Sequence, residues 1–312
     1  MSERYAELVG IGSSVYDTLM VVDRFPTEDT KLEGLETKVQ GGGPCTTALV
    51  AARKLGISAA YLGTIGKDTF GDYMLEDLRS WGVDVSGVRQ LEGVSFHSVV
   101  LLNRATGSRT CIWNRGSVPQ PTPDDLDNEA LSHARVLHLD GHMLNAAVYA
   151  AQYCRERGIK VCHDAGGAYP GIERLLKFVD WLIPSEEFAI KVTGEKEPEA
   201  AAQALYEAYR PELLVMTQGV RGGMLLDEKG LRRYPSYPVE AVDTNGSGDT
   251  FHGAFVAAKL KGLDNDDACR FASAAAAIKC TRLGARQAMA TEDEVDRFLA
   301  QRGEHLQSWN RE

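Results

Sequence analysis

Residues 239 to 256 read Val-Glu-Ala-Val-Asp-Thr-Asn-Gly-Ser-Gly-Asp-Thr-Phe-His-Gly-Ala-Phe-Val, and this stretch carries most of the information in the chain. An apolar segment runs into a glycine-rich turn at 246–248, and an amphipathic helix is expected from Asp249 to about Lys261. Glycines before a helix let backbone N–H groups point outward, and the helix N-terminus adds partial positive charge. The turn therefore predicts an anion site built from the amides of 246–248.

A carboxylate stands at this predicted anion site. Asp249 falls in the first turn of the helix, where its negative charge would repel a bound anion. One physical reason for it is that Asp249 takes a proton from a hydroxyl group that attacks a phosphorus atom. The motif alone leaves open a simpler interpretation, in which the aspartate caps the helix after a glycine turn.

Composition excludes several classes of protein. The chain has 312 residues, 44% of them hydrophobic and 25% charged, which is typical of a globular protein with a sizeable core. A formal net charge of −10 argues against nucleic-acid or anionic-membrane binding. The six cysteines are dispersed without a C-x-x-C pair, which argues against a zinc cage or a disulfide framework. Neither a leader peptide nor a membrane span is evident, so we expect a cytoplasmic protein.

Strand and helix patterns alternate along most of the chain. Strands are expected at 7–11, 59–63, 135–139, 159–164, 180–183 and 212–217, and helices at 46–55, 70–81, 144–157, 186–192, 198–209 and 265–281. This alternation predicts a mainly parallel sheet covered on both faces. Two β-rich segments, about 16–40 and 95–116, interrupt it and predict a small β lid, and a hairpin is expected over 223–234. We expect a single domain over 1–312.

The chain does not match three other well-known motifs, namely the dinucleotide fingerprint, the P-loop and the nucleophile elbow. The stretch 10–15 resembles the start of a dinucleotide fingerprint, but Val15 replaces the third glycine and 16–22 has a strand pattern. The stretch 63–67 resembles a P-loop, but Asp68 follows the lysine where Ser or Thr should bind magnesium. A G-x-S-x-G elbow is absent as well, although sequence alone does not exclude a Ser/His/Asp triad.

The run 243–249, Asp-Thr-Asn-Gly-Ser-Gly-Asp, resembles the D-T-x-G-A-G-D signature of the PfkB/ribokinase family of carbohydrate kinases. Four further segments match that family's motifs in order and spacing, namely 12–17 (G-x-x-x-x-D), the sugar loop 41–44 with its helix, 63–71 (G-x-x-G-x-D-x-x-G) and 217–222 (T-x-G-x-x-G). In the residues of its motifs the chain is most similar to sulfofructose-kinase-like and ketohexokinase-like members. The resemblance covers nearly the whole chain.

The resemblance implies an α/β fold, the ribokinase-like three-layer α/β/α sandwich with a mainly parallel sheet and a small β-sheet lid. It implies transfer of the γ-phosphoryl group of ATP to a hydroxyl of a furanose, keto-sugar or sugar derivative. ATP and Mg²⁺ are the implied cofactors, with K⁺ as an additional candidate. A homodimer formed through the β lid is the implied assembly.

The resemblance also assigns residues to roles. Asp249 is the expected general base, and the amides of Gly246, Ser247 and Gly248 form the anion hole. The expected substrate-binding residues are Asp17, Lys31, Gly42, Gly43, Thr47 and Asn114. The expected nucleotide-binding residues are Thr217, Gly219, Gly222, Asn245 and Ser273, and the expected metal-binding residues are Asp243 and Glu186.

The chain departs from the family pattern at its N-x-x-E motif, where Ser185 and Phe188 replace the asparagine and the glutamate. Glu186 or Glu187 would compensate through water-bound magnesium. Two alternatives stay open at this point. One is a nucleoside or aminosugar kinase of the same fold, with Phe96 or Trp113 as a face for the base, and the other is a non-catalytic sugar-binding regulator.

Four conspicuous polar residues lie outside these motifs. His252 follows Asp249 by one helical turn and is expected to pack in the interior rather than to react. His138, Asp140 and His142 cluster at a predicted sheet end, where they would face either the sugar or the core.

Overall fold

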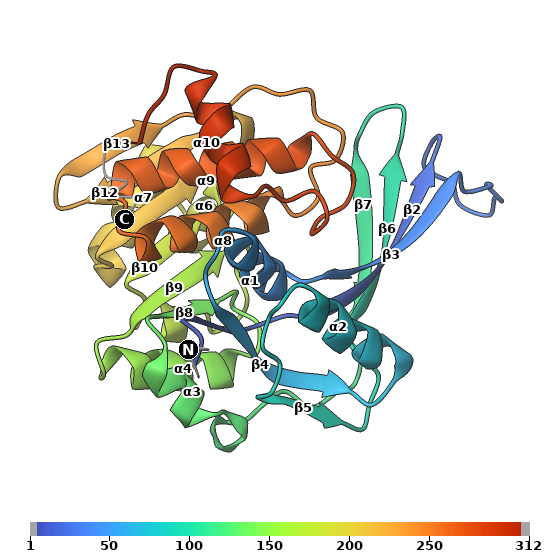
Figure 1. Cartoon of the computed structure of the whole chain (residues 1–312), viewed down its shortest axis with the longest axis horizontal. Coiled ribbons are helices and arrows are strands. Elements are labelled where there is room, and N and C mark those ends of the chain that lie inside the picture. Colours follow the sequence, from blue (N-terminus) through green and yellow to red (C-terminus); the bar gives the residue numbers. More distant parts are fainter. Residues whose placement is uncertain (1–4, 307–312) are drawn as a thin grey trace.

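A mostly parallel nine-stranded sheet lies at the centre of the molecule (Figure 1). The computed structural model describes residues 5–306, so the ends of the predicted 1–312 domain, 1–4 and 307–312, lie outside the described residues. In spatial order the strands are β13 (Gly230–Tyr234), β12 (Gly223–Asp227), β11 (Leu213–Thr217), β10 (Trp181–Pro184), β9 (Lys160–Ala165), β8 (Val136–Leu139), β1 (Leu8–Ile11), β4 (Ala59–Gly66) and β5 (Val88–Leu91).

The predicted hairpin forms the antiparallel edge of this sheet. β11 pairs with β12 and β12 with β13 in antiparallel fashion, whereas the pairs from β11 across to β5 are parallel. The central strand β1 is buried along its whole length, with Leu8 in one hydrophobic cluster and Val9 and Ile11 in the other. Burial on both faces is what a strand in the middle of a parallel sheet requires, so its sequence is continuously apolar.

Helices cover both faces of the sheet, which confirms the predicted three-layer architecture (Figure 1). One layer contains α1 (Pro44–Lys54), α2 (Thr69–Ser80), α8 (Ser247–Leu260), α9 (Asn265–Cys280) and α10 (Glu292–Ala300). The other contains α3 (Asn128–His133), α4 (Leu144–Arg155), α5 (Glu173–Leu176), α6 (Glu186–Thr193) and α7 (Pro198–Tyr209). Two short 3₁₀ turns, Pro123–Asp125 and Gly219–Arg221, complete the described elements.

The predicted lid is a separate four-stranded sheet at one side of the molecule (Figure 1). Its strands lie in the order β3 (Glu36–Gly42), β2 (Val15–Val22), β6 (His97–Asn103) and β7 (Arg109–Asn114). Alternate side chains of β2 and β6 form a small buried cluster that packs against Leu283, in the loop after α9. The lid therefore has one face toward the body of the protein and one face toward solvent.

Short elements account for the differences from the predicted pattern. The strand β5 and the helices α3 and α5 were not predicted, because four to six residues are too few to show a period. Helix α1 begins at Pro44, two residues earlier than predicted. Gly43 adopts a φ of +95° before it, and proline is well suited to the first helical position because it has no N–H to satisfy.

Helix α8 lies unusually close to α1. A Cβ atom added at Gly253 would come within 2.2 Å of the carbonyl oxygen of Ala48, so this approach needs a residue without a side chain. The closeness fixes the position of the first turn of α8 relative to the loop that precedes α1. Within residues 5–306, no helix combines the length and the apolar character needed to cross a membrane.

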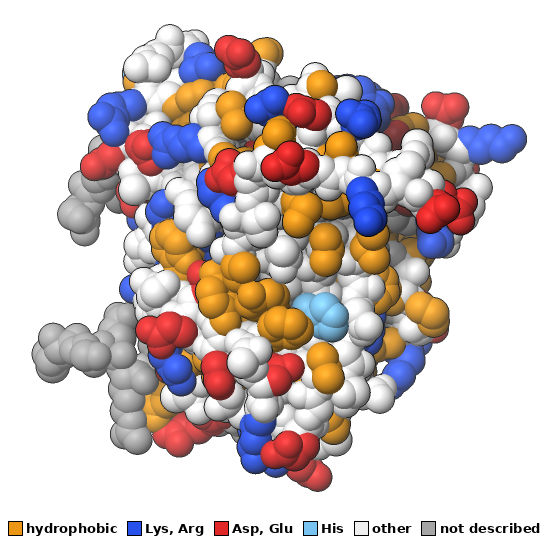
Figure 2. Space-filling view, turned by 90° about the vertical axis from the view of Figure 1, so that its right-hand side faces the viewer, with side chains coloured by type: hydrophobic (Ala, Val, Ile, Leu, Met, Phe, Trp, Pro, Cys, Tyr) orange, Lys and Arg blue, Asp and Glu red, His pale blue; other side chains and the backbone are white. Residues whose placement is uncertain are grey.

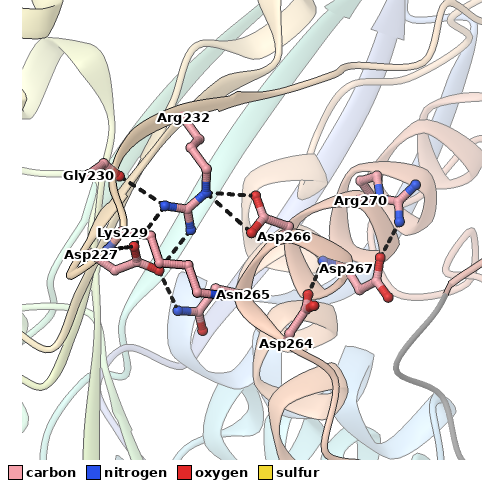
Figure 3. A network of polar contacts seen from close by, with 9 residues as sticks. All are labelled: Asp227, Lys229, Gly230, Arg232, Asp264, Asn265, Asp266, Asp267 and Arg270. Atoms are coloured by element: carbon pink, nitrogen blue, oxygen red, sulfur yellow. Dashed lines mark hydrogen bonds and ion pairs between the residues drawn. The ribbon is translucent and has the colours of Figure 1, made fainter.

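A polar network ties the antiparallel edge to the start of α9 (Figure 3). Arg232 on β13 donates two hydrogen bonds of 2.8 Å to the two carboxylate oxygens of Asp227 on β12. Its Nε also donates to Asp266, at 3.1 Å, and Asn265 Nδ2 donates to Asp227 at 2.8 Å. Asp227 is buried, and its hydrogen bonds from Arg232 hold the pKa of its carboxyl group below the ordinary value.

We expect Arg232→Leu to lower the free energy of unfolding by about 2–4 kcal/mol, because it leaves the Asp227 charge buried without its partner. Since the pKa of Asp227 is depressed in the folded state, this stabilisation is present above the unfolded pKa of about 4 and fades below it. Urea unfolding at pH 7 and pH 3 measures both effects. Arg233→Leu is the matched control, since its exposed pair with Glu199 should contribute at most about 1 kcal/mol. Equal losses in the two variants would contradict this account.

Candidate active site

Polar side chains gather where the parallel strands end at their carboxyl edge. Asp140 follows β8, Asp164 lies near the end of β9, and Ser13 follows β1. The Asp140 carboxylate accepts hydrogen bonds from the Ser13 amide (2.8 Å) and hydroxyl (2.6 Å), and from the amides of Cys45 (3.2 Å) and His142 (3.0 Å). Ligand sites of open α/β sheets lie at this edge. Asp140 thus holds three loops together at the place where a substrate would enter.

The glycine-rich turn leads into α8 at the same edge. Gly246 adopts a φ of +76°, and the Thr250 amide donates to its carbonyl oxygen at 2.9 Å, which starts the helix. The first N–H groups of a helix have no acceptor within it. The Ser247 amide donates to Thr244 O at 3.3 Å, and a Cβ atom at Gly248 would meet no atom within 4 Å. The turn is most accessible at Gly248, which is exposed, whereas Gly246 and Ser247 are half-buried.

A buried ion pair lies beneath this turn. Asp243 accepts hydrogen bonds from the amides of Asn245 (2.8 Å) and Gly284 (2.9 Å), one on each carboxylate oxygen. Lys279, whose side chain is fully buried, donates to the Asp243 carbonyl oxygen at 2.6 Å and lies 3.7 Å from its carboxylate. Asp243 and Asn245 thus shape the turn from within. The metal role predicted for Asp243 and the nucleotide role predicted for Asn245 stay predictions.

Asp249 projects from the first turn of α8 beside other acidic groups. Burial, and after it the negative charge of Asp164, raises the pKa of Asp249 to about 7. His252, one turn further along α8, lies with its Nε2 3.2 Å from Asp164 Oδ1, and both residues are buried. The predicted packing of His252 in the interior is confirmed, with Asp164 as a partner that the sequence did not reveal. A carboxyl group with a pKa near 7 is well matched to proton transfer at neutral pH.

The sugar-loop glycines lie against Asp17 of the lid strand β2. Asp17 is buried and accepts a hydrogen bond of 2.5 Å from the Ser98 hydroxyl, and burial raises its pKa. A Cβ atom at Gly42 would fall 1.9 Å from Asp17 Oδ2, and one at Gly43 would fall 2.5 Å from Ser13 O. These positions therefore require glycine. The structure brings the predicted Asp17, Gly42 and Gly43 together.

Arg286 binds the sugar loop at Gly42 and was not predicted from the sequence. Its side chain is almost fully buried and pairs with Asp77 on α2. It also donates to Gly42 O at 3.0 Å and to the Thr46 hydroxyl at 2.7 Å. Arg286 lies in the loop after α9 and belongs to no motif, and its partners are more than 200 residues away in the sequence.

The other predicted substrate residues are placed differently. Thr47 is buried in α1 beside the turn, with its Cγ2 3.6 Å from a Cβ atom added at Gly246. Lys31 is exposed in the loop between β2 and β3. This loop projects from the side of the lid (Figure 1). Asn114, exposed at the end of β7, accepts a hydrogen bond from the Gly116 amide at 2.8 Å. The structure thus brings Thr47 to the turn but does not bring Lys31 there.

The predicted cluster of His138, Asp140 and His142 at the end of β8 divides into different environments. His138 is fully buried, and burial lowers its pKa to about 4, so this imidazole is a neutral part of the core. His142 lines a small pocket at the base of the lid and contacts the Tyr169 hydroxyl through Nε2 at 3.0 Å. Arg115, another lining residue, lies 5.8 Å from the ring centres of both Phe96 and Trp113.

A second groove, of about 570 Å³, is larger than the pocket at the base of the lid and includes the first residues of α8 in its lining. Four of the predicted nucleotide residues line it, namely Thr217, Gly219, Gly222 and Ser273. Gly248 also lines it, and the aromatic residues Tyr234, Tyr237 and Phe251 are among its lining residues. Gly248 and the aromatic residues thus line the same partly apolar groove.

Glu186, a predicted metal residue, faces the loop after β11. It accepts hydrogen bonds from Gln218 Nε2 at 2.6 Å and from Arg221 at 2.5 Å. Across residues 5–306, no three His, Cys, Asp or Glu side chains gather in a way that would hold a metal ion.

Comparison with known proteins identifies the family. The model of the pfkB family carbohydrate kinases matches residues 6–292. The chain is 28% identical to ribokinase from Haemophilus influenzae, over 94% of this chain and 98% of the relative, and 27% identical to ketohexokinase from Mus musculus, over 88% and 96%. The structure of ribokinase from Arabidopsis thaliana complexed with ribose and ATP superposes with a TM-score of 0.83 at 26% identity, covering 94% and 98%. The chain belongs to the pfkB family of carbohydrate kinases, and its fold is ribokinase-like.

Proposed function

We propose that this kinase transfers the γ-phosphoryl group of ATP to a hydroxyl of a furanose, keto-sugar or sugar derivative, with Asp249 as the general base. The observation that carries the proposal is the position of Asp249. Its carboxyl group, with a pKa of about 7, stands in the same helical turn as the open amide of Gly248. A proton acceptor and an anion site side by side are what attack of a hydroxyl on a phosphoryl group needs.

The reaction balances as an in-line transfer. The sugar oxygen forms a bond to the γ-phosphorus while Asp249 takes the hydroxyl proton. The bond from the γ-phosphorus to the bridging oxygen breaks, and ADP leaves with that electron pair. The amides at the start of α8, with Gly248 the most accessible, stabilise the charge on the transferred group. Asp17 accepts hydrogen bonds from other sugar hydroxyls and so orients the ring.

The groove beyond Gly248 accommodates the nucleotide in this proposal. The related Arabidopsis ribokinase was solved with ribose and ATP, which supports a nucleotide site at the corresponding place. The described residues fit Mg²⁺ bound mainly through phosphates and water, a common mode for this ion. Glu186 and Glu187 line the cavity beside Thr217 and would act through metal-bound water. A requirement for K⁺ and a cytoplasmic location stay predictions.

The site favours a sugar over a nucleoside as the acceptor. The guanidinium of Arg115 already lies over the rings of Phe96 and Trp113, which were the faces available for a nucleobase. Membership of a carbohydrate kinase family argues against the regulator, as does the shifted pKa of Asp249, which a binding protein would not need.

We expect Asp249→Asn to reduce kcat by about 10²–10⁴-fold, because amide and carboxylate have similar shapes but the amide cannot accept the proton. Release of ADP from ATP and Mg²⁺ across a panel of sugars measures the loss. The variant should fold and still bind sugar and nucleotide. Because the pKa of Asp249 is raised in the folded protein, its ionisation opposes folding as the pH rises from about 4 to 7. Unfolding at pH 8 should therefore show Asp249→Asn to be at least as stable as the parent. Turnover within a few-fold of the parent would contradict the assignment.

The pH dependence of the parent enzyme tests the same group independently. A general base works only when deprotonated, so kcat/KM should rise with pH through about 7 and level off above it. Steady-state rates between pH 5.5 and 9, in buffers of constant ionic strength, give this profile. A rate that stays constant down to pH 5.5 would rule out a base with this pKa.

The solvent-facing side of the lid supports the proposed homodimer. Val39, Val99 and Ile112 are exposed there and lie in one row across the lid strands, with Thr18 of β2 between Val39 and Val99. Hydrophobic side chains gather on this side of the molecule (Figure 2). A contiguous exposed apolar surface commonly marks a protein contact. We expect the protein to sediment as a dimer and Ile112→Lys to sediment as a monomer in analytical ultracentrifugation. A monomeric parent protein would contradict the proposal.

A further inference from the structure

The turn before α8 already holds a cation, the ammonium group of Lys279. Lys279 lies near the end of α9, and its side chain is completely buried. Its Nζ donates to the Asp243 carbonyl oxygen at 2.6 Å and lies 3.7 Å from Asp243 Oδ2. The backbone also joins the two segments, because Cys280 O accepts hydrogen bonds from the amides of Val242 (2.8 Å) and Asp243 (3.2 Å). The ammonium group is therefore fixed beneath residues 243–246.

The residues around Asp243 do not fit a bound K⁺ ion. K⁺ is a candidate cofactor by family resemblance, and Asp243 is an expected metal-binding residue. Proteins bind K⁺ through several oxygen atoms, commonly backbone carbonyls. Each carboxylate oxygen of Asp243 already accepts a backbone amide, from Asn245 or from Gly284, and its carbonyl oxygen accepts the Lys279 ammonium. A K⁺ ion beside Asp243 would also be repelled by the positive charge of that ammonium group.

Negative charge accumulates at this turn, so a cation is useful there. Asp243 lies in the segment that leads into α8, and Asp249 lies in the first turn of the helix. In the proposed reaction, phosphate groups approach the same turn at Gly248. Negative charges in a poorly hydrated place need a nearby cation. Burial lowers the pKa of Lys279, and the charges of Asp243 and, less strongly, Asp249 oppose this shift, so the ammonium group interacts with both aspartates.

We propose that Lys279 is a positioning residue that supplies the cation beneath the turn, and that the kinase therefore works without K⁺. The inference rests on the proposed function. An ammonium group and K⁺ carry the same charge and are similar in size, and oxygen atoms bind either one. The ammonium group is attached to α9, so it is present whatever the concentration of K⁺. Lys279 acts through Asp243 and the turn, and it neither gains nor loses a proton during the transfer.

The parent protein gives the first test. Release of ADP in the presence of sugar, ATP and Mg²⁺ is measured while tetramethylammonium chloride replaces KCl at constant ionic strength. Because screening is then unchanged, kcat and both KM values should stay within about twofold. Saturable activation by K⁺ beyond this range would overturn the inference alone. A protein that phosphorylates no sugar, with or without K⁺, would instead contradict the proposed function.

Removal of the ammonium group should create a requirement for K⁺. Without K⁺, the kcat of Lys279→Ala should fall by roughly 10- to 100-fold, comparable to the loss of a group that orients the ligands of a metal site. K⁺ or ammonium chloride should restore much of the rate in a saturable manner, because the variant has space for a small cation beside Asp243. Tetramethylammonium, which is too large, should not. Lys279→Met fills the space without a charge, so no cation should restore its rate.

Thermal unfolding supplies a readout that does not depend on turnover. K⁺ should raise the melting temperature of Lys279→Ala, since it binds the folded state, but not that of the parent or of Lys279→Met. Lys259→Ala is the matched control, because Lys259 is half-buried at the opposite end of α8 and donates to Leu263 O at 3.3 Å. Its kcat should match the parent at every concentration of K⁺.

Three outcomes with the variants would overturn the inference. Lys279→Ala would be fully active without K⁺, or no cation would restore its rate, or K⁺ would restore Lys279→Ala and Lys279→Met equally. The measurement on the parent protein does not depend on whether these variants fold.

Discussion

The buried contact between Lys279 and Asp243 is the interaction on which the rest of the site depends. The lysine side chain has no exposure to solvent, and its ammonium group holds the Asp243 carbonyl while the carboxylate oxygens bind two backbone amides. This pairing fixes residues 243–246, which lead into α8. Gly246 is the N-cap of the helix and has a left-handed conformation. If the two groups separated while buried, each unpaired charge would cost several kcal/mol. The turn therefore has little freedom to rearrange.

Because the turn is fixed, the start of α8 can hold a carboxylate at a place that also favours anions. The start of α8 attracts anions through its free amides, yet it also carries the Asp249 carboxylate in a poorly hydrated place. The conflict appears as the raised pKa of Asp249, which keeps the group poised between its two protonation states near neutral pH. The neighbouring Asp164 contributes to that shift and is itself balanced by His252. Near the turn, Asp243 and Asp164 therefore each have a basic partner, whereas no ion pair is described for Asp249 within residues 5–306.

Motifs with local causes could be read from the sequence, whereas residues defined by distant partners could not. Gly42 and Gly246 are glycine because of a close approach and a positive φ, and both lie in recognisable turns. Lys279 near the end of a helix and Arg286 in a loop look like ordinary solvated cations until the fold buries them. Glu186 is assigned a metal role only by the family resemblance. In the fold, Gln218 and Arg221 of the loop after β11 both donate to its Oε2, and the sequence did not reveal these contacts.

The most direct test of this account is a titration of the Asp249 carboxyl group itself. Carbon-detected NMR of protein labelled at the aspartate carboxyl carbons, with Asp249→Asn to assign the resonance, reports its protonation without reference to turnover. The account predicts a midpoint near pH 7, set by burial and by Asp164. A midpoint near 4, the ordinary value for an aspartate, would show that the group is well solvated and would contradict the central claim.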